Sequence, residues 1–454
     1  MAVAATPIDR PTLFFYALPA FALAMPTIPV YVYLPTFYAD SLGLGLAATG
    51  AVLLAARVLD VITDPLVGIG SDRIRLRVGR RKPWILAGAV LAGVALVRLF
   101  APPDGAGTGY LLTWVVVLYL GWTLVAVPYT AWGAELSPDY HERARITGAR
   151  EGVMIIGILA AGSIPAAAAY AGYAERDGLA AVAWLAVGFG APAIALLLWR
   201  VGEPARREAP PIAATTASPA LSEWRSILAN KPFLRLMAGW FVNGLANGLP
   251  AVMFPLYLEY ALEADAVERG VLIMTYFLAG VLAIPGWVAL SRRYGKHRVW
   301  CWAMLLACVA FVWVPLLDAR ALGAFFVICV VTGMAFGADL ALPPAMQADV
   351  IDLDSMRTGR QRAGLFFALW SMSTKLALAG AVGIAFPILS AFGFQTGGAN
   401  TGGAILVLTV IYAFAPTVLK IAAIAIVWNH PITARRQTVI RRRLDAMAGR
   451  VELR

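Results

Sequence analysis

Three ionisable side chains lie within eight residues of a stretch that is otherwise apolar: Arg57, Asp60 and Asp64. Residues four apart in a helix lie on the same face, so Asp60 and Asp64 point the same way, with Arg57 about one turn before them. An ionised carboxylate in the middle of a bilayer is costly, and such residues usually face a polar cavity and mark an ion pathway. The spacing therefore predicts a cation-binding or proton-binding site. The alternative is a structural ion pair between Arg57 and one of the acids.

Two ions suit such an acidic pair. Carboxylates with hydroxyls nearby fit a hard cation such as Na⁺, which prefers oxygen ligands. The same pair can instead hold a proton, because two carboxylates at close range do not both stay ionised at low cost. Na⁺ and H⁺ therefore remain alternatives for the ion bound at this site. We expect no cofactor, and no metal beyond a transported Na⁺.

The elements that must position these residues are transmembrane helices. Of the 454 residues, 60% are hydrophobic and only 14% are charged, which is too apolar for a surface that faces water. Apolar stretches of about twenty residues can each cross a bilayer as a helix. Twelve such stretches begin near Thr12, Leu44, Trp84, Tyr110, Gly152, Leu179, Phe233, Gly270, Val299, Ala321, Gly364 and Ala404. The sequence predicts an all-α membrane protein with twelve transmembrane helices.

The net charge of +11 is distributed unevenly among the loops. If the N-terminus is inside, most basic residues fall on inner loops and ends, at Arg10, 73–82, 143–150, 200–235, 292–298, 357–362 and the tail from Arg435. This asymmetry follows the positive-inside rule. We therefore expect both termini in the cytoplasm, a bacterial inner membrane location and no nucleic-acid partner. The basic tail also suits anionic membrane lipids.

A polar connection at residues 202–232 divides the chain into two halves. We expect an N-terminal six-helix bundle at 1–201, a cytoplasmic linker with a short surface helix at 202–232, a C-terminal six-helix bundle at 233–430 and a basic cytoplasmic tail at 431–454. The halves repeat at constant offsets within each motif: Pro65 and Ser71 match Pro285 and Ser291, and Glu135 and Arg143 match Asp349 and Arg357. Internal symmetry of this kind is typical of transporters.

Three stretches carry a resemblance to a known family: "DVITDPLVGIGSDRIRLRVGRRKPW", "VPYTAWGAELSPDYHERARI" and "TGRQRAGLFFALWSMSTK". They resemble the glycoside–pentoside–hexuronide:cation symporters, the melibiose-permease branch of the major facilitator superfamily. The resemblance implies the major facilitator fold, with two pseudo-symmetric six-helix bundles and alternating access, in a monomer. It also implies cation-coupled symport of a sugar or sugar-acid type small-molecule solute. Some animal relatives carry amphipathic solutes such as lysolipids, and that alternative stays open.

The resemblance also implies roles for single residues. In this family the acidic pair is assisted by a neighbouring polar residue, here Thr63, and by a threonine of the fourth span, here Thr123. A lysine of the eleventh span faces the cavity, which corresponds to Lys375, deep in an apolar stretch. The family also has a sugar-binding arginine close to Arg150 and an aromatic residue at the position of Tyr31. Where this chain has Thr63 the family has Asn, so Na⁺ and H⁺ stay alternatives.

The substrate pocket departs from the family at two positions, because Ala24 and Ala126 replace sugar-binding acids. The candidate substrate-binding residues are Tyr31, Thr130, Arg150, Asn243, Asn247 and Lys375, with Arg57 and Asp339 as charge partners. Asp339 could serve the pocket or pair with Lys375, whereas Lys420 is expected to extend toward the inner interface. Unpaired buried charge is costly, so this pocket favours an anionic or amphipathic solute over a neutral disaccharide.

Acidic and basic residues recur at the inner ends of both halves. We expect ion pairs among them to form a cytoplasmic gate, with the members Asp72, Arg73, Glu135, Arg143, Arg293, Asp349 and Arg357. The alternative is a solvated charge run, because exposed ion pairs contribute little. We find no catalytic constellation in the sequence, so an enzyme is not expected.

Overall fold

The computed structural model describes residues 8–27, 46–74, 79–170, 175–203, 226–394 and 400–452, and also residues 29, 30, 34, 37, 38 and 42–44. Throughout these ranges the regular elements are helices, and they cluster into two compact units. Unit 1 comprises residues 1–207 and 361–371, and unit 2 comprises 208–360 and 372–454. Tyr31 and most of the predicted linker at 202–232 lie outside the described residues.

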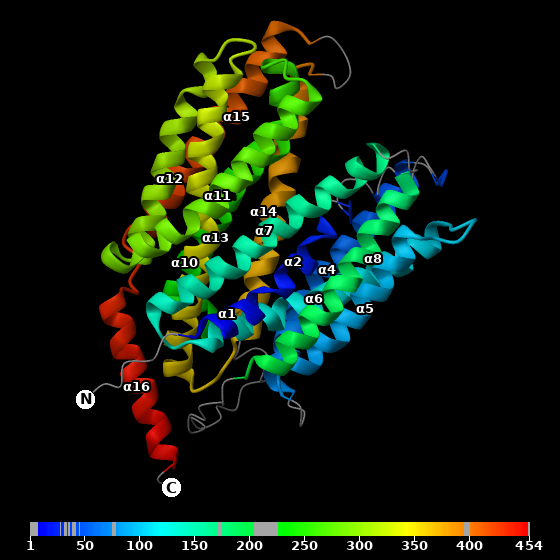
Figure 1. Ribbon diagram of the computed structural model, residues 1–454. Helices are drawn as coiled ribbons and strands as arrows, with labels where there is room; N and C mark the ends of the chain where they lie inside the picture. The colour runs from blue at the N-terminus through cyan, green and yellow to red at the C-terminus, as the bar shows by residue number, and fades with distance from the viewer. Residues whose placement is uncertain are drawn as a thin grey trace. The chain divides into compact units, whose positions relative to one another are not determined.

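Unit 1 packs the N-terminal helices against one another. They are α1 (Arg10–Ala17), α2 (Pro19–Ala24), α4 (Leu46–Arg73), α5 (Lys82–Phe100), α6 (Thr108–Leu136), α7 (Tyr140–Tyr170) and α8 (Glu175–Arg200). Helix α6 lies beside α4 and α5, and α7 lies beside α2 and α8 (Figure 1). A Cβ added at Gly121 would lie 2.6 Å from the backbone nitrogen of Ala92, so α6 touches α5 there through its backbone. Thr123 follows Gly121 by two residues, a rotation of about 200° about the helix axis. Its side chain therefore faces away from α5.

Unit 2 contains most of the later helices. They are α10 (Lys231–Leu256), which continues as a π-helical turn at Tyr257–Ala261, α11 (Ala266–Tyr294), α12 (Lys296–Val312), α13 (Leu322–Thr358), α14 (Ala363–Ala391), α15 (Gly402–Val427) and α16 (Ala434–Glu452). Helix α13 lies beside α11 and α12, and α15 lies beside α10 and α12 (Figure 1). The residues of α14 up to Ser371 belong to unit 1, so this helix runs from one unit into the other.

Nine helices within the described ranges are long and apolar enough to cross a membrane. They match the predicted spans that begin near Trp84, Tyr110, Leu179, Phe233, Gly270, Val299, Ala321, Gly364 and Ala404. The second predicted span forms α4, whose apolar stretch carries the three ionisable residues, and the fifth lies in α7, whose first turns are charged. The first predicted span falls partly on α1 and α2 and partly on residues outside the described ranges.

The predicted basic tail folds as part of unit 2. It forms α16, which packs on α13. Arg441 Nε lies 3.1 Å from Asp352 Oδ2, and Gln437 Nε2 donates to the same oxygen at 2.5 Å. The tail is therefore anchored to the bundle by a buried carboxylate.

Candidate functional site

The acidic pair meets a hydroxyl from a second helix. Helix α4 provides Asp60 and Asp64, and α6 provides Thr123, whose Oγ1 lies 3.1 Å from Asp60 Oδ1 and 2.8 Å from Asp64 Oδ1. All three side chains are buried. A threonine hydroxyl carries one proton and can donate it to one acceptor only. The second oxygen–oxygen contact therefore favours a proton or a cation among these oxygens.

Arg57 completes this cluster on the side of Asp60. Its Nη1 lies 3.0 Å from Asp60 Oδ2, and its guanidinium carbon lies 4.7 Å from the ring centroid of Tyr119. When all are ionised, one guanidinium and two carboxylates carry a net charge of −1. One monovalent cation brings the three groups to zero. The ion pair that the sequence left as an alternative is thus present, and Asp64 supplies a further carboxylate beside it.

Thr63 is placed differently from Thr123. Its Oγ1 donates to the backbone carbonyl of Asp60 at 3.0 Å, within its own helix. One residue along a helix corresponds to a rotation of about 100°, so Thr63 does not share the face of Asp64. Pro65 follows, and because proline has no N–H, the carbonyl of Val61 lacks its usual helical donor beside the pair.

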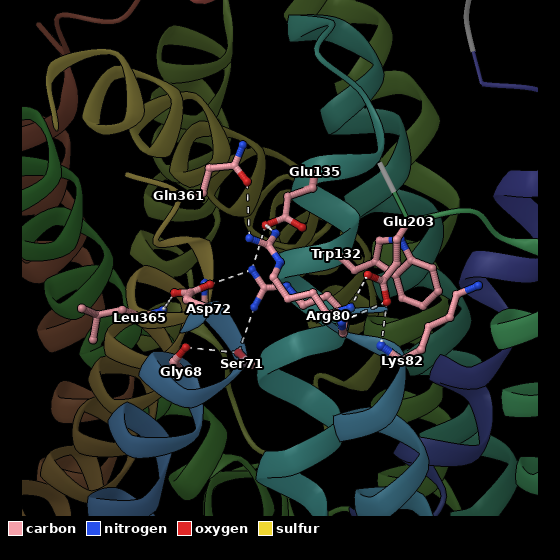
Figure 2. Close-up of polar contacts among 12 residues, drawn as sticks. Gly68, Ser71, Asp72, Arg80, Lys82, Trp132, Glu135, Glu203, Gln361 and Leu365 are labelled. Carbon is pink, nitrogen blue, oxygen red and sulfur yellow. Dashed lines mark hydrogen bonds and ion pairs between the residues drawn. The ribbon is translucent and has the colours of Figure 1, made fainter. Parts of the chain in front are cut away.

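A second cluster of charges lies where α4, α5 and α6 end or begin (Figure 2). Arg81 donates from Nη2 to Asp72 at 2.7 Å and to Glu135 at 2.8 Å, and from Nη1 to Ser71 at 2.8 Å. Arg80 donates to Glu135 at 2.6 Å. Burial by itself lowers the pKa of Arg81, but the carboxylates of Glu135 and Asp72 more than offset this, so its pKa is raised and it stays charged.

Glu203 holds the loop that presents these two arginines. Its carboxylate accepts from the backbone N–H groups of Arg80, Arg81 and Lys82 at 2.7 to 2.9 Å (Figure 2). These groups belong to the start of α5, where N–H groups lack helical partners and a negative charge is favourable. Gly79, with φ of 128°, makes the preceding turn in a region that side chains disfavour.

Asp72 also binds the start of α14. Its carboxylate oxygens accept from the backbone N–H groups of Gly364 and Leu365, each at 2.9 Å. The backbones approach closely beside it, because a Cβ added at Gly364 would lie 2.6 Å from the carbonyl oxygen of Gly68. Within unit 1, α4 therefore caps α14 with a carboxylate, and the cap needs glycine at both positions.

Unit 2 repeats the pair of Arg80 and Glu135. Lys296 follows Gly295, which has φ of 88°, and its ammonium lies 2.6 Å from Asp349 Oδ2. The side chains of this pair are 0% and 2% exposed, whereas those of Arg80 and Glu135 are 14% and 21% exposed. The repeat of Glu135 and Asp349 in the sequence thus reflects equivalent acids. Each pairs with a base that follows a glycine at the start of an earlier helix, Arg80 before α5 and Lys296 at the first position of α12.

Three of the cations that meet these acids, Arg80, Arg81 and Lys296, are not among the predicted gate residues. They lie in the stretches "GRRK" and "GKHR", whereas the prediction named Arg73 and Arg293, which lie in the last turns of α4 and α11. Arg143 donates from Nε to the carbonyl of Ser137 at 3.1 Å, Arg293 lies over the ring of Tyr294, and Arg73 and Arg357 are exposed. Arg80, Arg81 and Lys296 were missed because both loops turn at a glycine and bring the later bases back over the helix ends.

The polar residues of α10 form a third cluster, in unit 2. Lys420 donates to Asn243 Oδ1 at 3.0 Å and to Asn247 Oδ1 at 2.7 Å, and lies 4.0 Å from Asp339 Oδ2. Asn247 Nδ2 donates to Asp339 at 2.8 Å, and Trp300 donates to its other oxygen. Lys420 is buried, so the expectation that it extends to the interface is wrong. Asp339 carries the charge opposite Lys420, while Lys375 is half-buried on α14.

The remaining candidate residues lie in unit 1. Thr130 donates to the carbonyl of Ala126 at 2.7 Å, a bond within α6. Arg150 forms an ion pair with Glu151, and its guanidinium carbon lies 5.9 Å from the centroid of the Tyr129 ring. Arg150 therefore has an acidic partner next to it in the chain, at Glu151.

Apolar membrane-spanning helices and buried charge clusters define an integral membrane transporter. The chain belongs to the MFS/sugar transport protein family, which it matches over residues 15–434.

Individual relatives agree with this family. The chain is 24% identical over 425 residues to a glucuronide carrier protein homolog of Escherichia coli (strain K12), covering 91% of this chain and 90% of that protein. It is 24% identical over 432 residues to the sodium-dependent lysophosphatidylcholine symporter 1 of Mus musculus, with coverage of 87% and 80%. The structure of the E. coli fucose:proton symporter matches with a TM-score of 0.63 at 12% identity, over 91% of this chain and 97% of that one. The predicted fold class and family are confirmed.

Proposed function

We propose that this protein is a symporter that couples the movement of a small solute to Na⁺ or H⁺ bound at Asp60 and Asp64. The observation that carries the proposal is the convergence of the buried Asp60 and Asp64 carboxylates on the hydroxyl of Thr123, with Arg57 beside Asp60. Two carboxylates at close range repel each other when both are ionised, and a bound cation or proton relieves that repulsion. Cation binding therefore favours the closed state through which the site must pass.

The proposal is tested in proteoliposomes that contain the purified chain. Radiolabelled methyl β-D-glucuronide and methyl β-D-glucoside serve as solutes, since the relatives carry glycosides or glucuronides by name. We expect accumulation above the external concentration when an inward Na⁺ or proton gradient is imposed. Collapse of that gradient with a matching ionophore should abolish accumulation. Equal uptake with and without every gradient would contradict coupling.

The preference for a charged solute depends on the basic residues of the predicted pocket, Arg150 and Lys375. Arg150 forms an ion pair with Glu151, and Lys420, outside that prediction, lies 4.0 Å from Asp339. We propose Lys375, a half-buried lysine within the apolar helix α14, as the residue that recognises a sugar acid. We expect Lys375→Gln to weaken glucuronide binding about tenfold, the size of one charge-assisted hydrogen bond, and to leave glucoside binding within about twofold.

Calorimetry on purified protein compares the two solutes for each variant. Arg150→Gln is the matched control, because it removes a cation that already has a partner, and it should change the binding of both solutes alike. A Lys375→Gln protein that binds glucuronide as tightly as the unmodified chain would contradict a pocket role. If the binding of both solutes were weakened equally, Lys375 would instead stabilise the fold.

The charge cluster around Arg81 is proposed as the gate, with the basic loops on the cytoplasmic side as their composition predicts. Support comes from the Asp72 cap, which ties α4 to α14, a helix whose later part belongs to unit 2. Breaking this cap or its arginine partners should free that helix. The gate would then open more readily toward the cytoplasm.

A charge reversal tests the gate. Glu135→Lys places a cation beside Arg80 and Arg81, so we expect it to shift the population toward inward-open states. Accessibility of engineered outer-cavity cysteines to a membrane-impermeant thiol reagent should fall severalfold. Glu142→Lys is the control, because Glu142 pairs with Arg145 outside the cluster. If both variants and the parent were labelled to the same extent, Glu135 would have no role in the gate.

A further inference from the structure

Unit 2 contains a cavity whose lining does not include the acidic pair. Its volume is about 230 Å³, and α10, α11, α12, α13 and α15 form its walls. Seven of the nineteen lining residues are aromatic: Phe254, Tyr276, Phe277, Phe311, Phe325, Phe336 and Tyr412. Ala251 and Pro255 of the lining are exposed, so the cavity has an accessible side along α10.

The two ends of the cavity differ in chemistry. At one end Phe254 lies near Phe325 and Tyr412, with ring centroids 6.0 and 6.4 Å away. At the other end Asn247, Asp339 and Lys420 form the hydrogen-bonded cluster described above. Phe336, about one helical turn before Asp339 on α13, stacks with Tyr276 at a centroid distance of 5.5 Å, so aromatic rings also adjoin the polar end. The cavity thus has aromatic rings along it and a polar cluster at one end.

The polar end is balanced in charge but still has hydrogen-bonding capacity. Lys420 has three N–H donors, and the two asparagines take two of them. The Asp339 carboxylate offers about four acceptor positions, and Trp300 and Asn247 occupy two. A hydroxyl group can therefore donate to Asp339 and accept from Lys420, whereas an added charge would leave the pair unbalanced.

The volume limits the apolar part of an occupant. An apolar cavity of about 150 Å³ holds a benzene ring, and sites for drug-sized ligands usually measure about 300–1,000 Å³. This cavity lies between those values. It suits one aromatic ring with a short polar substituent and is small for a disaccharide or a long acyl chain.

We propose that this cavity is a binding site for a neutral aryl alcohol, with the ring among the aromatic side chains and the hydroxyl between Asp339 and Lys420. Burial of the apolar ring away from water makes the binding free energy more favourable. The hydroxyl retains its hydrogen bonds, which it would lose in a wholly apolar cavity. Binding at this site needs neither a bound cation nor the charge clusters of unit 1.

The test uses 4-fluorobenzyl alcohol and the full chain in lipid nanodiscs, with binding followed by ¹⁹F NMR. We expect saturable binding to the unmodified protein. 4-Fluorotoluene lacks the hydroxyl and should bind about tenfold more weakly, the equivalent of one hydrogen bond in a buried site. 4-Fluorobenzoate adds a negative charge and should not bind detectably.

Filling the cavity identifies the site. Ala335→Leu adds a side chain to the lining of α13 and should weaken binding at least tenfold. Ala422→Leu is the matched control, because Ala422 is exposed on α15 and is not part of the lining. Should Ala335→Leu fail to fold, Ala251→Leu on the exposed side of the cavity replaces it.

Two results would overturn the proposal: no saturable binding to the unmodified protein, or equal binding to the folded cavity-filled variant. Because the assay contains no ion gradient and no sugar, its failure leaves cation coupling unaffected. Conversely, Asp64→Asn should lose gradient-driven uptake but bind 4-fluorobenzyl alcohol as tightly as the unmodified protein.

Discussion

Asp64→Asn is expected to abolish accumulation of solute against a gradient and to leave the protein folded in the membrane. The change removes one carboxylate from a buried group of three charges, so Arg57 and Asp60 alone already sum to zero. A cation then gains no net attraction from the site. Uptake should fall to the level at which inside and outside concentrations are equal, and Asp60→Asn should behave in the same way.

Direct binding measurements make this prediction independent of the solute. Calorimetric titration with Na⁺ and proton uptake measured with an indicator dye should each be compared for the parent and Asp64→Asn, and the ion that loses its binding is the coupling ion. Thr123→Ser should bind that ion nearly normally and Thr123→Ala about tenfold more weakly, because only the serine keeps an oxygen ligand. Thr63→Val is the matched control, since its hydroxyl bonds to the backbone. Uphill transport at the parental level by both Asp→Asn variants would refute the assignment.

Lys296→Met is expected to cause a large loss of stability in unit 2. It leaves Asp349, whose side chain is 2% exposed, without the ammonium 2.6 Å away. Removing one partner of a buried ion pair typically costs about 3–5 kcal/mol, whereas replacing both partners by apolar residues is often neutral. The double variant Lys296→Met/Asp349→Leu should therefore recover most of the loss.

The cysteines of the chain provide the measurement. Cys301, Cys308 and Cys329 are buried, so a thiol-reactive dye reports their exposure as the protein is heated. The unfolding midpoint should drop clearly for Lys296→Met and much less for Arg80→Met, whose pair with Glu135 is more exposed. A double variant as unstable as the single one would show that Asp349 is not destabilised by the missing cation.

Local periodicity accounts for what could be predicted about the coupling site. Asp60 and Asp64 share a face in any helix that contains them, and Arg57 lies within reach of Asp60 for the same reason. The spacing thus left the ion pair open as an alternative and placed the second carboxylate on the same face. It could not assign the Thr63 hydroxyl, because a side chain near its own backbone can bond there instead.

The sequence by itself determined the membrane character, the helical spans, the repeat of acids and the face on which Asp60 and Asp64 lie. These follow from hydropathy and helical spacing, which act over a few residues. The family resemblance named Thr123 as an assistant of the acidic pair, and the tertiary structure shows that its hydroxyl reaches both acids. Only the tertiary structure decided that Arg81 and Lys296 meet the repeated acids and that Lys420 lies inside beside Asp339. Each of these contacts joins different elements. Their partners depend on how far each helix is rotated and shifted against its neighbour, which close backbone contacts such as those at Gly121 and Gly364 set, and no local pattern encodes that rotation.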